Sequence, residues 1–296
     1  MSPERPDSAA VATPRPLVAD LPPQAQWVLE GARILQTQHA CGQMVWHAWG
    51  TGEPLVLLHG GSGSWTHWLR NVESLAASGR TVWVPDLPGC GDSDPPPEGH
   101  DADALVEPLA QGLGHLFGPA PVDLAGFSFG GLCAGLLASA HPGRLRRLVL
   151  VGAPVLALGA RPVRLMEWRH LPTAQERAAV HRANLAALML HHRASITPLA
   201  VALHAANLAR DRLRRRRMAR GDALQRALQS VALPVAAIYG REDALYRDRT
   251  EALEAALRQA PALASIDFIP DAGHWVQFEA PQRFDELLLR ALARMA

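Results

Sequence analysis

The sequence has little cysteine and almost no net charge. Its 296 residues include three cysteines, and its formal net charge is +1. Cys41, Cys90 and Cys133 are widely spaced and form no C-x-x-C pair, so a zinc or redox motif is not indicated. An odd number of distant cysteines fits a reducing, cytoplasmic compartment better than a disulfide framework. The balanced charge gives no reason to expect nucleic acid as a partner.

Signal and membrane-spanning segments are also not expected. The first 16 residues carry Glu4 and Asp7, lack an apolar stretch and are rich in Pro, Ser and Ala, which argues against a secretory signal and predicts a disordered tail over residues 1–25. The most apolar window, residues 121–140, contains Asp123 and a glycine cluster. A buried strand that runs into a buried helix explains this window better than a membrane span. The chain also lacks a Walker lysine and a G-x-G-x-x-G fingerprint, which argues against nucleotide binding.

Strands and helices are predicted to alternate along most of the chain. Residues 31–49 contain two β-type stretches around a short Ala-Cys-Gly turn, which can pair as a hairpin. Short apolar runs then alternate with helix-like stretches over residues 54–155, and this rhythm resumes after residue 230. It is typical of βαβ units. We therefore expect an α/β fold, with a mostly parallel eight-stranded sheet and helices on both faces.

Residues 156–230 interrupt this rhythm. They are almost wholly helix-like and too long to be a loop within a compact sheet. We interpret them as a helical cap inserted between two parts of the core, residues 26–155 and 231–296. The basic run at residues 212–217 is expected to be mainly a solvated helix face, although one arginine could turn inward to hold a substrate carboxylate. Four histidines of the cap lie near one another without an acidic ligand, so no metal is expected; they are His181, His191, His192 and His204.

One motif predicts a nucleophile. Residues 126–130 read Gly-Phe-Ser-Phe-Gly, the one match to G-x-S-x-G in the chain, and they lie between an apolar strand and an apolar helix. In this context the serine occupies a sharp, strained turn that exposes its hydroxyl group. The helix N-terminus behind it favours developing negative charge. We therefore predict that Ser128 is a nucleophile.

A serine nucleophile needs a base, and the base needs an orienting carboxylate. His274 is the one histidine after residue 243, and it follows the last predicted strand. Asp243 lies three residues beyond Gly240, where another predicted strand ends, and its neighbour Glu242 is the competing candidate. The order Ser128, Asp243, His274 is the order expected for this kind of fold.

A glycine-rich stretch, residues 59–65, follows another predicted strand and can supply an oxyanion hole. We expect the backbone N–H groups of Gly61 and of Phe129, which directly follows the nucleophile, to hold the oxyanion. Four further residues are expected to line the substrate pocket: Gly60, Ser62, Phe127 and Trp275. Asp86 and Asp92 are expected to shape a turn rather than to take part in catalysis.

Taken together, these stretches resemble the α/β-hydrolase superfamily from about residue 27 to the end of the chain. The stretches that carry the resemblance are residues 59–65, 86–94, 126–131, 240–246 and 271–281. The resemblance implies an α/β-hydrolase fold and a cofactor-free serine hydrolase that acts on a small molecule through an acyl-enzyme. Haloalkane dehalogenases and epoxide hydrolases carry aspartate at the nucleophile position, so Ser128 argues against both activities.

The glycine-rich loop and the His274-Trp275 pair are also similar to those of the meta-cleavage-product hydrolases, which cleave carbon–carbon bonds. Those enzymes usually have asparagine directly before the nucleophile, where this chain has Phe127. The main expectation is therefore cleavage of an ester-type bond in a small, largely apolar carbonyl substrate, with carbon–carbon cleavage as the alternative. An acyltransferase, a cofactor-free haloperoxidase and a non-catalytic receptor also remain open.

Overall fold

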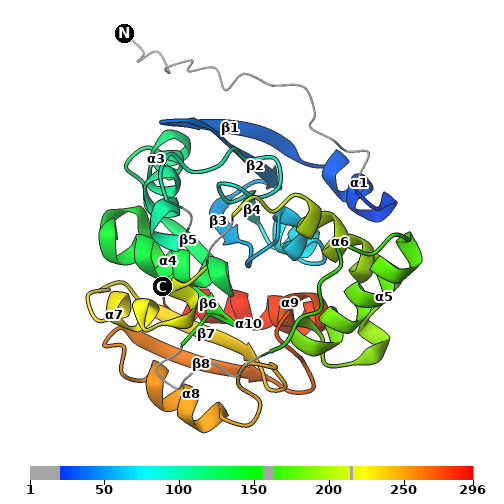
Figure 1. Cartoon of the computed structure of the whole chain (residues 1–296). Coiled ribbons are helices and arrows are strands. Elements are labelled where there is room, and N and C mark those ends of the chain that lie inside the picture. The colour runs from blue at the N-terminus through cyan, green and yellow to red at the C-terminus, as the bar shows by residue number, and fades with distance from the viewer. Residues whose placement is uncertain (1–20, 100, 156–162, 214–215, 296) are drawn as a thin grey trace.

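The computed structural model describes residues 21–99, 101–155, 163–213 and 216–295. Its eight strands form a single sheet (Figure 1). The strands are β1 (Arg33–His39), β2 (Gly42–Trp49), β3 (Glu53–Leu58), β4 (Arg80–Pro85), β5 (Val122–Phe127), β6 (Leu145–Val151), β7 (Val235–Gly240) and β8 (Leu263–Ile269). Their order is β1-β2-β4-β3-β5-β6-β7-β8, with β2 antiparallel to both of its neighbours and every other pair parallel. The predicted hairpin and the mostly parallel eight-stranded sheet are confirmed.

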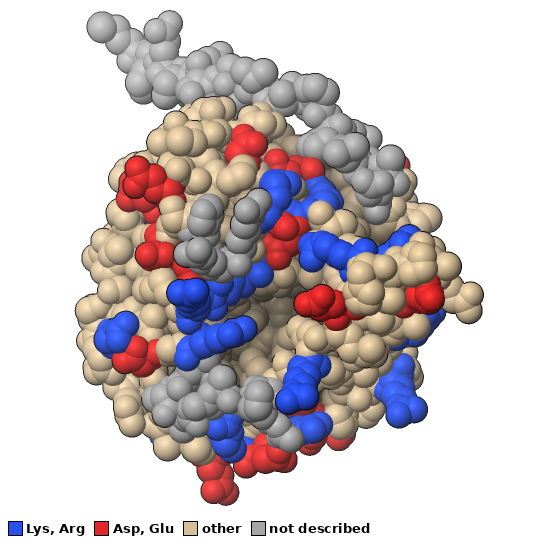
Figure 2. All heavy atoms as spheres, in the orientation of Figure 1, with Lys and Arg blue, Asp and Glu red and all other residues tan. Residues whose placement is uncertain are grey.

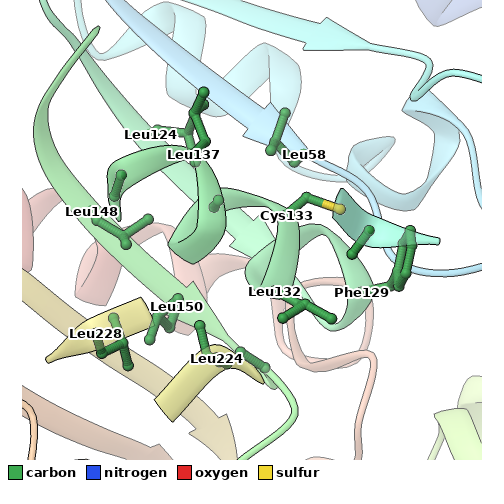
Figure 3. Close-up of a cluster of buried hydrophobic side chains, with 14 of the residues drawn as sticks. Leu58, Leu124, Phe129, Leu132, Cys133, Leu137, Leu148, Leu150, Leu224 and Leu228 are labelled. Carbon is green, nitrogen blue, oxygen red and sulfur yellow. The ribbon is translucent and has the colours of Figure 1, made fainter. Parts of the chain in front are cut away.

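Helices cover both faces of the sheet. One face carries α3 (Val106–Phe117), α4 (Phe129–Ala140), α7 (Ala223–Leu228) and α8 (Thr250–Leu257), and the other carries α1 (Pro23–Glu30), α2 (Val72–Ala77), α9 (Val276–Glu279) and α10 (Pro281–Arg294). Side chains alternate between the two faces along each strand, so that Leu58 and Leu57 enter different clusters. Figure 3 shows leucines of β5, β6, α4 and α7 gathered in the hydrophobic cluster that contains Leu58. Burial on both faces explains why the strand sequences are continuously apolar.

The N-terminal boundary of the folded unit differs from the expectation. Helix α1 begins at Pro23 and buries Ala25, so residues 23–25 belong to the folded unit rather than to the tail expected up to residue 25. The rest of that predicted tail, residues 1–20, lies outside the described residues. The apolar window at residues 121–140 is β5 followed by α4, as the sequence predicts. Within the described chain, no helix has the length and apolar character needed to cross a membrane.

The described part of residues 156–230 is built from helical turns and irregular segments. Its elements are α5 (Ala174–Asn184), η6 (Leu185–Met189), η7 (Arg193–Ser195), α6 (Pro198–Ala209), η8 (Met218–Arg220) and α7. Helix α5 begins at a capping box in which Thr173 and Glu176 satisfy each other's backbone N–H groups. Helices α5 and α6 pack together to one side of the sheet (Figure 1), whereas α7 packs on α4. The last part of the expected cap therefore belongs to the layer on the sheet face.

Candidate active site

Ser128 lies in the tight turn between β5 and α4. Its backbone has φ +50° and ψ −116°, a conformation that non-glycine residues rarely adopt and that marks a strained site. Its N–H donates a hydrogen bond of 2.7 Å to the carbonyl of Val151, which ties the turn to β6. A Cβ atom on Gly130 would lie 2.4 Å from the carbonyl oxygen of His59. The turn therefore requires glycine at this position because backbone occupies the space of a side chain.

His274 and Asp243 form a hydrogen-bonded chain with Ser128. The His274 Nε2 atom is 2.9 Å from Ser128 Oγ, and the His274 Nδ1 atom is 2.7 Å from Asp243 Oδ2. Because a carboxylate only accepts, Nδ1 carries the proton and Nε2 is free to accept the serine proton. The second carboxylate oxygen accepts a 2.9 Å hydrogen bond from the Leu245 N–H, which orients the group. Glu242, the competing candidate, takes no part in this chain.

The ends of three parallel strands bring these side chains together. Ser128 follows β5, Asp243 follows β7 and His274 follows β8, and the carboxyl ends of parallel strands meet at one edge of a sheet. The turn after β7 is fixed by a hydrogen bond of 2.8 Å from the Tyr246 N–H to the Asp243 carbonyl. Beyond His274, the Trp275 N–H donates a 2.7 Å hydrogen bond to the Met189 carbonyl. The histidine loop is thereby tied to the segment between β6 and β7.

Gly61 and Phe129 lie side by side next to Ser128. A Cβ atom built on Gly61 would lie 3.5 Å from the Cβ atom of Phe129. Within the described chain, neither backbone N–H donates to a protein acceptor. Two free N–H groups beside a nucleophile are what an oxyanion hole requires, and the N-terminus of α4 adds a favourable partial charge.

A cavity of about 580 Å³ opens in front of Ser128 and His274. Its further lining comes from the core, with Gly61, Ser62, Phe127, Phe129, Pro154 and Leu245, and from the segment between β6 and β7, with Val163, Leu165, Leu188, Met189, Arg216, Ala219 and Arg220. Figure 2 shows a central hollow on this face, with basic side chains gathered around it. The described lining is mostly apolar and contains two arginines but no carboxylate.

Two of the four expected pocket residues do not line this cavity. Ser62 and Phe127 are part of the lining, whereas Gly60 and Trp275 lie behind it. A Cβ atom on Gly60 would lie 2.9 Å from the Phe127 ring, so the glycine backs that ring. Trp275 is buried, and its indole Nε1–H donates a 2.9 Å hydrogen bond to the carbonyl of His67. The sequence places both residues next to catalytic ones but does not show which way they face.

The basic run does not form the solvated helix face that is mainly expected, and one of its arginines, Arg216, turns inward as the sequence allows. The described residues of the run, 212–213 and 216–217, are irregular, and the Arg212 side chain donates to the carbonyls of the Asp86–Asp94 turn. Arg216 reaches the cavity because Asp211 accepts two hydrogen bonds from it, of 2.7 and 2.8 Å. Its guanidinium also lies over the Phe129 ring, 5.4 Å from the centroid. Arg220 is exposed and forms no ion pair with another described residue.

One cluster in the described chain has the residue types of a metal site. His47, Asp86 and Asp92 place ligand atoms within 4.8 Å of one another. Asp86 accepts 2.8 Å hydrogen bonds from the N–H groups of Trp65 and Asp92, and Asp92 pairs with Arg210. These contacts account for the cluster as the support of a turn, which is the role that the sequence predicts for both aspartates.

Comparisons with known proteins identify the family and the fold. The sequence model of the "Alpha/beta hydrolase family" matches residues 55–287. The chain is 30% identical over 255 residues to the 2-hydroxymuconate semialdehyde hydrolase of Pseudomonas sp. (strain CF600), which covers 82% of this chain and 87% of that protein. Its structure is similar to the meta-cleavage product hydrolase from Pseudomonas fluorescens IP01, with a TM-score of 0.70, 22% identity and coverage of 88% and 98% of the two chains. The esterase RhEst1 from Rhodococcus sp. ECU1013 gives a TM-score of 0.70, 22% identity and coverage of 90% and 100%.

The matched residues include the serine turn, the acid loop and the histidine loop, so the family assignment and the site geometry rest on the same part of the chain. The match also covers well over half of the sequence. The chain therefore belongs to the alpha/beta hydrolase family.

Proposed function

We propose that this protein is a serine hydrolase that cleaves a carbon–carbon bond next to a ketone in a small vinylogous diketone acid. The observation that carries the proposal is the cavity itself, which joins Ser128 and His274 to two arginines and has no carboxylate in its described lining. The name of the relative from Pseudomonas sp. (strain CF600) supports carbon–carbon cleavage better than it supports ester cleavage.

The first step is attack on the ketone. His274 Nε2, 2.9 Å from the hydroxyl oxygen, takes the Ser128 proton while Oγ bonds to the carbonyl carbon. Asp243 stabilises the imidazolium that forms. The negative charge that develops on the carbonyl oxygen is held by the N–H groups of Gly61 and Phe129.

Cleavage then releases a carbon leaving group. The electron pair of the broken bond moves into the conjugated system, away from Ser128, and His274 returns its proton to the leaving carbon. Water, deprotonated by the same histidine, breaks the acyl-enzyme and gives a carboxylic acid.

A cation near the far end of the substrate would bind its carboxylate in the ground state and in the transition state alike. Arg216 shares its charge with Asp211, which accepts from it at 2.7 and 2.8 Å. Arg220 lines the same cavity and has no ion pair within the described chain. We therefore assign the carboxylate contact to Arg220 and a wall-building role to Arg216.

A second candidate is cleavage of a carboxylic ester, and Phe127 favours it. This residue directly precedes the nucleophile, lines the cavity and lies 5.1 Å, between ring centroids, from His274. An apolar ring at this place suits an apolar acyl group, and the same triad and N–H groups perform acyl transfer from an ester.

The two candidates are separated by comparing substrates. Purified protein would be assayed with 2-hydroxy-6-oxononadienedioate, a vinylogous diketone acid in its keto form, and with p-nitrophenyl esters of increasing chain length, and Ser128→Ala would serve as the blank. We expect kcat/KM for the diketone acid to exceed that for the best ester by about 100-fold or more. The reason is that the carboxylate contact with Arg220, which a neutral ester lacks, raises kcat/KM. A preference for an ester would replace the proposal by the second candidate.

A further inference from the structure

The glycine before the oxyanion loop residue Gly61 is held by two buried histidines. The Gly60 carbonyl oxygen is 2.8 Å from Nδ1 of His59, and the Gly60 N–H donates to Nδ1 of His67 at 3.1 Å. The exposed fractions of His59 and His67 are 0% and 3%. Both peptide units that flank Gly60 are therefore fixed by side chains that do not touch the cavity.

The partners of each imidazole define where its proton sits. A carbonyl oxygen can only accept, so His59 carries its proton on Nδ1, while its Nε2 accepts a 2.9 Å hydrogen bond from the Leu87 N–H. Nδ1 of His67 accepts from Gly60, so the proton of that ring sits on Nε2. Both rings must be neutral for these contacts, and burial lowers the pKa of each histidine.

The contact with His59 sets the direction of the Gly61 N–H. The Gly60 carbonyl and the Gly61 N–H belong to the same peptide unit, and in a planar trans peptide they point in opposite directions. Because His59 holds the carbonyl oxygen, the Gly61 N–H must point away from His59, and Gly61 itself lies next to Phe129. A rotation of this peptide would turn a carbonyl oxygen toward the developing oxyanion.

His67 is itself held firmly. A Cβ atom on Gly63 would lie 2.4 Å from the His67 ring, so the ring occupies the place of a side chain at that position. The His67 carbonyl accepts from the Trp275 indole, and the two rings are 5.0 Å apart between centroids. The Phe127 ring also contacts His67, edge to face, with 5.5 Å between the ring centroids. Trp275 directly follows His274, so its contact with His67 connects the catalytic base to the oxyanion loop.

We infer that His59 and His67 are positioning residues that clamp Gly60 and thereby hold the Gly61 N–H at the oxyanion. This Gly60 clamp, made of His59 and His67, acts through the backbone and does not contact substrate. The inference rests on the oxyanion role given to Gly61 in the proposed function. It also gives a reason for the order His-Gly-Gly-Ser-Gly in this chain, since the second histidine needs the space that the last of these glycines leaves.

A matched pair of amide variants tests the clamp. In His67→Asn, the amide oxygen takes the position of Nδ1 and can still accept from Gly60, whereas in His67→Gln it lies one bond farther out. We expect kcat of His67→Gln to fall about 10- to 100-fold with KM within about threefold, a little less than the loss of a whole oxyanion donor. His67→Asn should keep kcat within about fivefold of the wild type, because the acceptor is restored.

The readout has two parts. The rate at which a fluorophosphonate labels Ser128 should fall in parallel with kcat in His67→Gln, and the melting temperatures of the two variants should be similar. A second pair, His59→Asn and His59→Leu, keeps or removes the donor to the Gly60 carbonyl and carries the test if the first pair does not fold. Equal losses in the Asn and Gln variants, or a change in KM alone, would overturn the clamp while leaving the proposed function intact. A wild-type protein that turns over substrate without labelling at Ser128 would overturn both.

Discussion

The two walls of the cavity are built in different ways. The core wall is the part of the lining that holds Ser128 and His274, and the cap wall is the part between Val163 and Arg220. At the core wall, His274 is 2% exposed and Asp243 behind it is 0% exposed. Hydrogen bonds join Ser128, His274 and Asp243, and all three residues follow strands of the sheet. On the cap wall, Leu165 is 50% exposed and Arg220 projects from a short turn. Since geometry on the core wall is fixed by many partners, we assign the reaction to that wall and substrate choice to the cap wall.

The walls meet at the oxyanion loop. Ser62 donates a 2.6 Å hydrogen bond to Asp211, and Ser64 donates one of 2.7 Å to Asn207 of α6. These contacts fix where the cap side chains stand relative to Ser128. If the two walls have separate roles, changes on the core wall lower kcat, whereas changes on the cap wall alter KM and leave kcat nearly unchanged.

Removal of the nucleophile should have the largest effect. Ser128→Ala is expected to lower kcat by about 10⁴- to 10⁶-fold, in the range seen when a triad serine is lost. Steady-state kinetics would measure this change, and substrate binding should persist because the cap wall is intact. Ser139→Ala, on the surface next to Ser230, is the matched control and should keep full activity. Residual activity of Ser128→Ala above about one hundredth of wild type would be too high for the loss of a nucleophile.

The orienting acid comes next. Asp243→Asn should lower kcat about 10⁴-fold, because an amide favours the wrong tautomer of His274. The neighbouring substitution Glu242→Gln keeps the same size and charge change but leaves the hydrogen-bonded chain intact, so its kcat should stay within about threefold. Equal effects of the two substitutions, measured under saturating substrate, would contradict the assignment of Asp243.

A change on the cap wall should act on binding. Arg220→Met is expected to raise KM for a carboxylate substrate about 10- to 100-fold, since hydrogen bonds to charged groups contribute about 1.5–3 kcal/mol. Its kcat should change little, and KM for a neutral ester should not change. Arg226→Met removes an arginine that pairs with Asp222 on the surface and serves as the control. A fall in kcat without a change in KM would show that Arg220 acts on the chemical step and not on substrate binding.

The smallest effect concerns pH and the stability of the cap. Burial, and then the nearby His181, lowers the pKa of His204 on α6 to about 4. The folded protein therefore binds fewer protons than the unfolded chain between about pH 4 and 6.5, so this histidine costs stability as the pH falls through that window.

At pH 5 this cost is about 1–2 kcal/mol in the free energy of unfolding. Urea denaturation at pH 7 and pH 5 would show it as a loss that His204→Phe reduces, because the substituted ring has no proton to bind. An identical loss in the wild type and the variant would show that His204 does not contribute. The matched substitution His192→Phe, at an exposed position, should leave the pH dependence unchanged.

The core wall could be predicted from the sequence, and the reason is local. Ser128, Asp243 and His274 each follow a strand closely, and parallel strands bring their carboxyl ends to one edge without further information. The strand runs are continuously apolar and the turns carry glycine, so both signals are present in the residues themselves. The choice of Asp243 over Glu242 agrees with the observed hydrogen bonds.

The cap wall could not be predicted in the same way. The sequence allows one arginine of the run to turn inward but does not show which one. Arg216 reaches the cavity because it pairs with Asp211, which directly precedes the run. Trp275 faces away from the cavity because its indole N–H donates a hydrogen bond to the His67 carbonyl. The sequence also does not single out the two histidines of the Gly60 clamp, since their role depends on distances between side chains and backbone groups in the folded chain. The repeated glycines of residues 59–65 were the available signal for them.

Covalent labelling tests whether Ser128 is the activated nucleophile of this site. Folded protein would be treated with a fluorophosphonate, and the modified peptide would be identified by mass spectrometry. We expect one adduct, on Ser128, that forms much more slowly in Asp243→Asn. An adduct on another serine, such as Ser62 in the same cavity, or no adduct on protein that turns over substrate, would contradict it.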